Sequence, residues 1–132
     1  MIGPLWKETT RARKQRERAE MRVEVQRLRE SRRRIYARDG GRCQATGKPV
    51  DLTTDNPWRL AHVHHVVFRS VGGTNDTGNL VTLCADAHDL IHRHLLTIAG
   101  NADEMLLFTR FQGNGQIARM WHSPCPSGGA HE

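Results

Sequence analysis

The sequence predicts an α+β fold, with a long basic N-terminal helix, a small strand–loop–strand–helix core and a C-terminal β-hairpin. Residues 11–37 contain neither Gly nor Pro and are rich in good helix formers. Residues 60–92 hold five of the eight histidines, among short apolar runs separated by a Gly-rich loop. Residues 95–99, 105–111 and 116–121 are predicted strands of this C-terminal β-hairpin, and Gly113-Asn114-Gly115 is the turn before the last of them. The chain has 132 residues, which predicts one domain with appendages.

The N-terminal extension, residues 1–38, is expected to be mainly helical. Thr9 or Thr10 is placed to cap the helix, and Asp39-Gly40-Gly41 is placed to end it. A narrow apolar stripe at helical spacing could pack on the core or form a short coiled coil, which would make a homodimer. The stripe consists of Met21, Val25, Leu28 and Ile35.

The basic charge is concentrated in this extension. Residues 11–38 contain 12 Lys or Arg and 4 Glu, a net charge of +8, whereas the whole chain has +6. Such a segment is the electrostatic footprint expected for a polyanion, most simply DNA. The alternative is an ordinary solvated helix face. The candidate nucleic-acid contacts are Arg32, Arg33, Arg34 and Arg38.

The core segment, residues 39–95, contains the strand–loop–strand–helix pattern. Residues 63–68 and 80–83 are predicted strands, and the polar run 72–78 is the loop between them. Residues 86–94 are a predicted helix, with Asp86 near its positive N-terminal end. Trp58 and Leu60 are expected to seal the core beneath the site.

The spacing of the histidines predicts which of their side chains point to the same side of a helix or strand. His88 and His92 are four residues apart, so they share one face of the predicted helix. His64 and His65 are adjacent on a strand and point to opposite sides. One imidazole can therefore hold a metal while its neighbour meets another partner. His62 lies on the same strand face as His64 and is an alternative ligand.

These residues resemble the HNH endonucleases, whose fold is a ββα-metal unit. The resemblance covers roughly residues 34–94. The matching features are the pair His64-His65, the loop Arg69-Ser70-Val71-Gly72-Gly73, Asn79 before an apolar strand, His88 on the following helix, and the run from Arg38 to Cys43.

The resemblance implies a metal-dependent endonuclease that nicks or cuts DNA. It assigns one divalent metal to His64 and His88, with His92 a candidate third ligand; Mg²⁺, Mn²⁺, Ni²⁺ and Zn²⁺ all remain open. His65 would be the general base, Asn79 would orient it, and Arg69 would reach a phosphate oxygen. The alternatives are a structural role for His65, a loop cap for Asn79 and a surface position for His92. The competing function is a non-catalytic nucleic-acid-binding module with the same fold.

The sequence departs from the family pattern at its cysteines. Many members have two Cys-x-x-Cys pairs that hold a structural zinc, but here only Cys43 and Cys84 remain of them. A structural zinc is therefore not expected, and both thiols are expected to pack as small apolar groups. An odd total of three cysteines argues against a disulfide framework.

The remaining features of the sequence concern its C-terminal segments and the expected cellular location of the protein. Residues 96–123 form the predicted β-hairpin, and the Pro-, Ser- and Gly-rich segment 124–132 is expected to be a disordered tail. No apolar run has membrane-spanning length, and the N-terminus does not resemble a signal peptide. We therefore expect a cytoplasmic protein with no membrane partner, and the resemblance to HNH endonucleases implies a phage or bacterial source.

Overall fold

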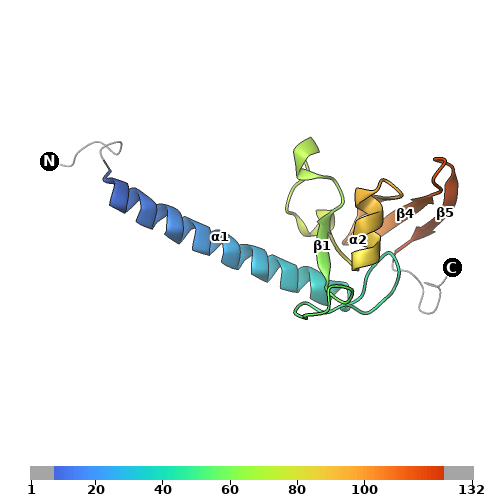
Figure 1. Cartoon of the computed structure of the whole chain (residues 1–132), viewed down its shortest axis with the longest axis horizontal. Helices are drawn as coiled ribbons and strands as arrows, with labels where there is room; N and C mark the ends of the chain where they lie inside the picture. The colour runs from blue at the N-terminus through green and yellow to red at the C-terminus, as the bar shows by residue number, and fades with distance from the viewer. Residues whose placement is uncertain (1–7, 124–132) are drawn as a thin grey trace. The chain divides into compact units, whose positions relative to one another are not determined.

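The computed structural model describes residues 8–123 and has the mixed α+β composition that the sequence predicts (Figure 1). The chain divides into two units, Met1–Arg32 and Arg33–Glu132. The predicted tail at 124–132 lies outside the described residues. The elements are α1 (Thr10–Arg38), β1 (His62–His65), the 3₁₀ turns η2 (Arg69–Val71) and η3 (Thr77–Asn79), β2 (Leu80–Leu83), α2 (Ala85–His92), β3 (Leu96–Asn101), β4 (Met105–Phe111) and β5 (Ile117–His122).

Helix α1 begins and ends where the sequence predicts. The hydroxyl of Thr9 accepts a hydrogen bond from the backbone N–H of Ala12, at 3.1 Å, which satisfies one free donor of the first turn. Gly40 and Gly41 follow the helix with φ of 68° each. Of the predicted apolar stripe only Ile35 is buried, and the other three side chains are exposed. No helix of the described residues is both long and apolar enough to cross a membrane.

Strands β1 and β2 form a short antiparallel pair in which His64 lies opposite Val81 and His65 opposite Leu80. All four residues of β2 are buried. The prediction that the first strand extends to Phe68 is wrong, because β1 ends at His65. Beyond it, the side chain of Asn79 bonds both the backbone N–H and the carbonyl of Val67, in place of a ladder partner.

Helix α2 starts after Cys84, whose sulfur accepts the backbone N–H of Ala87. The prediction that this helix extends to His94 is wrong by two residues. His94 adopts a left-handed conformation with φ of 59°, its N–H bonds the carbonyl of Ile91, and the N–H of Leu95 bonds the carbonyl of Leu90. This pair of bonds satisfies the last carbonyls of a helix and stops it.

The C-terminal segment is a three-stranded antiparallel sheet in the order β3-β4-β5, and its strands lie within two residues of the three that the sequence predicts. Strand β4 is central and pairs along its length with both neighbours. Leu96, Leu106 and Phe108 from this sheet share one hydrophobic core with Leu83 of β2 and Ala87 of α2. The sheet therefore packs against the histidine-bearing elements and supports them.

Two side-chain predictions for the core have opposite outcomes. Trp58 is 71% exposed, so the prediction that it seals the core is wrong. Trp121 fills that role: its ring stacks on Phe108, and its indole N–H bonds the carbonyl of Ala45. Cys43 and Cys84 are buried members of the core with free thiols, as predicted.

Candidate active site

Four histidine rings gather where β1 meets α2, and Figure 1 shows these two elements side by side. His62 stacks on His88 with 4.5 Å between ring centroids, and His64 lies edge-on to His88 at 5.6 Å. His92 lies 4.4 Å from His88 and 6.2 Å from His64. The structure thus brings together His64, His88 and His92, with His62 as a fourth member.

Local folding explains this convergence. His62 and His64 are two residues apart on β1, so both side chains leave the same face of the strand. On α2, Ala87 and Ile91 are buried in the core. The residue after each, His88 and His92, turns toward β1. The burial of Ala87 and Ile91 in the core therefore fixes the direction in which the side chains of His88 and His92 point.

The environment lowers the pKa values of two members of the cluster, His64 and His88. Burial, followed by the neighbouring imidazoles of His88 and His92, lowers the pKa of His64 to about 4. Burial and the ring of His62 likewise lower the pKa of His88 below its usual value. A neutral imidazole has a free lone pair, which is the form that binds a metal.

The donor set fits a divalent metal at two of its positions. Two nitrogens that each bind an ion at about 2.0–2.1 Å, near the tetrahedral angle, lie roughly 3.2–3.4 Å apart. The Nε2 atoms of His88 and His92 are 3.2 Å apart. Within residues 8–123, no group of three or more His, Cys, Asp or Glu side chains is already arranged as a complete metal site. The Nε2 atoms of His88 and His92 are therefore spaced as two ligands of one ion would be, and the His64 ring lies beside them.

His65 faces the other side of β1 and has a separate partner. Its Nε2 lies 2.8 Å from Oδ1 of Asn75, in the loop between η2 and η3. Asn75 is a site residue that the sequence did not predict. Its only signal there is a polar side chain in the Gly-Gly-Thr-Asn run, and spacing alone does not show which strand residue a loop side chain will meet.

Asn79 holds that loop and does not contact the ring of His65. Its Oδ1 accepts the N–H of Val67, and its Nδ2 donates to the carbonyls of Val67 and Thr74. One side chain thus clamps both ends of the loop that carries Asn75. Any effect of Asn79 on His65 runs through the position of that loop.

The Gly-Gly pair of the loop is required by close packing. Gly72 has φ of 94°, and a Cβ on Gly73 would lie 1.8 Å from the carbonyl oxygen of Val67. Beside the pair is an open polar groove of about 330 Å³. It is lined by Val67, Gly72, Gly73, Thr74, Asp76, Gly78, Asn79, Gly100 and Asn101.

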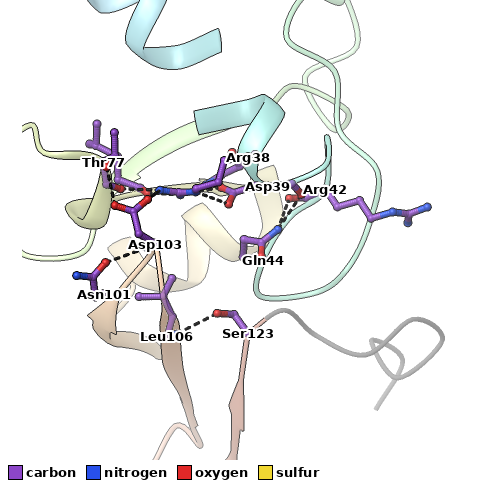
Figure 2. Close-up of polar contacts among 11 residues, drawn as sticks. Arg38, Asp39, Arg42, Gln44, Thr77, Asn101, Asp103, Leu106 and Ser123 are labelled. Carbon is purple, nitrogen blue, oxygen red and sulfur yellow. Dashed lines mark hydrogen bonds and ion pairs between the residues drawn. The ribbon is translucent and has the colours of Figure 1, made fainter. Parts of the chain in front are cut away.

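Arg38 has an internal role, which differs from the predicted contact with nucleic acid (Figure 2). Its guanidinium donates to both carboxylate oxygens of Asp39, to Asp103 and to the carbonyls of Thr77 and Leu80. Arginine has five N–H donors, and these five bonds use all of them. Arg38 therefore ties the end of α1 to η3, β2 and the β3–β4 turn, and it has no donor left for a phosphate.

The other predicted phosphate contacts are differently placed. Arg69 begins η2 and is exposed, as are Arg33 and Arg34, whereas Arg32 is partly buried. Their positions are compatible with contact to a large ligand, which stays a prediction.

The comparisons with known proteins agree with this geometry. Residues 41–94, which contain β1, β2 and α2, match the family model described as HNH endonuclease. This segment is an HNH domain.

A curated relative of this chain is the Type IV methyl-directed restriction enzyme EcoKMcrA of Escherichia coli strain K12. The two are 36% identical over 83 residues, which cover 53% of this chain and 28% of that enzyme. The chain thus corresponds to less than a third of the relative's length. No solved structure matches the chain significantly.

Proposed function

We propose that the HNH domain hydrolyses phosphodiester bonds of DNA with the help of one divalent metal ion. The observation that supports this most is that the neighbours His64 and His65 lie on opposite sides of β1 and meet different partners. His64 lies beside the rings of His88 and His92 on one side of the strand, and His65 meets Asn75 on the other. A ligand cluster and a separate base are the two parts that metal-assisted hydrolysis needs.

In this proposal His64 and His88 hold the ion, and His92 is the third ligand. The bound ion would stabilise the charge that develops on the phosphate and on the leaving 3′ oxygen. The 3.2 Å separation of the His88 and His92 Nε2 atoms and the lowered pKa of His64 support this set. Neutral imidazoles suit Zn²⁺ and Ni²⁺ best, so these ions are tested beside Mg²⁺ and Mn²⁺.

His65 is the proposed general base that takes a proton from the attacking water. An amide oxygen can only accept a hydrogen bond, so the contact with Oδ1 of Asn75 places the ring proton on Nε2. The lone pair is then on Nδ1, which is the atom proposed to take the proton. Asn79 keeps the loop in place, and exposed Arg69 is proposed to meet a phosphate oxygen of the same substrate.

A supercoiled-plasmid assay tests this function. The protein is incubated with EDTA, Mg²⁺, Mn²⁺, Ni²⁺ or Zn²⁺, on methylated and unmethylated plasmid, because the relative EcoKMcrA is named as methyl-directed. Metal-dependent nicked or linear product supports the nuclease. DNA binding without cleavage under every condition would favour the alternative, a binding module that keeps the HNH fold.

A further inference from the structure

The N-terminal part of α1 is a helix whose side chains bury nothing. Every residue from Thr10 to Glu30 is exposed. Most helices of folded proteins are stabilised by packing an apolar face against the core, and this stretch has no such packing because its few apolar side chains are exposed as well. Such a segment is therefore available for a ligand along its whole surface.

The charges of this helix are sorted onto faces. Five basic residues follow one another at steps of three, four, four and seven, which keep side chains on one face of a helix. The same residues line two shallow hollows of about 540 and 500 Å³ that share Arg18. We call these five the basic face: Arg11, Lys14, Arg18, Arg22 and Arg29.

The remaining arginines of this stretch are neutralised by glutamates. The ion pairs are Arg13–Glu17 at 3.6 Å, Arg16–Glu20 at 3.1 Å and Arg27–Glu24 at 4.0 Å. In contrast, the structure records no ion pair among residues 8–123 for the five residues of the basic face. The uncompensated positive charge is therefore arranged as one strip.

We propose that the basic face binds the phosphate backbone of duplex DNA, independently of base sequence. From Arg11 to Arg29 the strip is about 27 Å long, at 1.5 Å per residue, which corresponds to roughly 8 base pairs of duplex at 3.4 Å each. Guanidinium groups suit phosphate oxygens, because their planar fork can donate two bonds to one phosphate. The inference rests on the proposed function, since it assigns the face to the same substrate.

A second copy of the chain fits this face poorly. The exposed apolar side chains Met21 and Val25 line the same hollow as Arg18, Arg22 and Arg29. A dimer that buried this hollow against its copy would bring both sets of arginines together. Like charges in contact destabilise an interface. Charge complementarity thus favours the polyanion.

Two triple variants of the full chain test the face while removing the same total charge. Glutamine is used because it removes the charge and has a helix propensity similar to that of arginine. The face variant carries Arg18→Gln, Arg22→Gln and Arg29→Gln. The control variant carries Arg13→Gln, Arg16→Gln and Arg27→Gln, and circular dichroism checks that both stay helical.

Binding to a short duplex is measured in EDTA over a range of salt concentrations, so that cleavage plays no part. Each lost phosphate contact flattens the log–log salt slope by about 0.9. The face variant should lose about 2–3 units of slope, equally for unrelated sequences, and the control variant less than about 1. Equal losses in both variants, no loss in either, or a change of solution mass in the face variant alone would overturn the proposal. A catalytically inactive protein that shows the expected slopes would refute only the nuclease.

Discussion

Oδ1 of Asn75 lies 2.8 Å from Nε2 of His65, and this is the only hydrogen bond recorded for the His65 ring within residues 8–123. It joins a strand residue to a loop that Asn79 holds in place through three further bonds. In the proposed mechanism the contact sets which ring nitrogen has the free lone pair. His65 therefore depends on a residue ten positions away in the sequence.

Replacing Asn75 tests this dependence. Asn75→Ala should lower kcat roughly 10-fold or more, because a positioned base contributes about 10²–10⁴ in rate and would lose its orienting partner. Metal affinity should stay unchanged, since the ligands lie on the other side of β1. Asn75→Asp should move the acid limb of the pH–rate profile to higher pH, because a carboxylate favours the protonated imidazole. A wild-type rate and profile in both variants would remove Asn75 from the site.

Arg38 should matter for stability more than its partly exposed position suggests. Arg38→Lys leaves one ammonium for acceptors that now bind five guanidinium donors, so we expect a loss of roughly 2–4 kcal/mol in the free energy of unfolding. Arg34→Lys, at an exposed position of the same helix, is the matched control and should change it by less than about 0.5 kcal/mol. Urea denaturation measures both. Equal small effects would show that the contacts in Figure 2 contribute little.

The lowered pKa of His64 makes stability depend on pH in a defined window. Its pKa is about 4 in the folded protein and 6.5 ordinarily, so between these values the unfolded chain binds the proton more readily. Stability of the metal-free protein should therefore fall as pH drops from about 6.5 to about 4, by an amount of the order of 3 kcal/mol. His64→Gln should flatten this dependence. Urea unfolding at pH 7, 5.5 and 4.5 gives the curves, and identical slopes for the two proteins would contradict the assignment.

The cysteines should contribute to packing and not to metal content. Cys43 and Cys84 are buried side by side, and the hydrogen bond between them, together with burial, raises the pKa of Cys43. Cys43→Ser places a hydroxyl in an apolar core, so a loss of about 1–3 kcal/mol is expected. Metal analysis should give the same number of ions per chain as in the wild type. One ion fewer per chain in Cys43→Ser would instead indicate a structural zinc.

Local sequence patterns predicted where most helices and strands lie, whereas some of their ends depend on contacts between residues far apart in the sequence. The strand Leu80–Leu83 and the limits of α1 follow from apolar runs, a capping Thr and a Gly pair, all of which act over a few residues. The early end of β1 depends on Asn79, which lies twelve residues after Val67. Its side chain bonds the backbone N–H and carbonyl of Val67 in place of a neighbouring strand. No periodicity in the strand itself contains that information.

The candidate site likewise combines features that local spacing predicts with features that only long-range contacts determine. The spacing of His88 and His92 correctly placed them on one helix face, because four residues make about one turn. The role of Arg38 could not be read in this way. A basic run predicts attraction to a polyanion, but its last member is engaged by carbonyls and carboxylates from three distant segments. Trp58 and Trp121 differ likewise, since only tertiary packing decides which large ring is covered.

The central claim is that His65 is a base and His64 a metal ligand, although they are neighbours on one strand. The decisive measurement compares His65→Ala and His64→Ala for metal binding by calorimetry and for plasmid cleavage in parallel. His65→Ala should keep wild-type metal affinity and lose cleavage by about 10²-fold or more, whereas His64→Ala should lose both. Wild-type cleavage by His65→Ala, or metal binding lost in His65→Ala and kept in His64→Ala, would contradict the account.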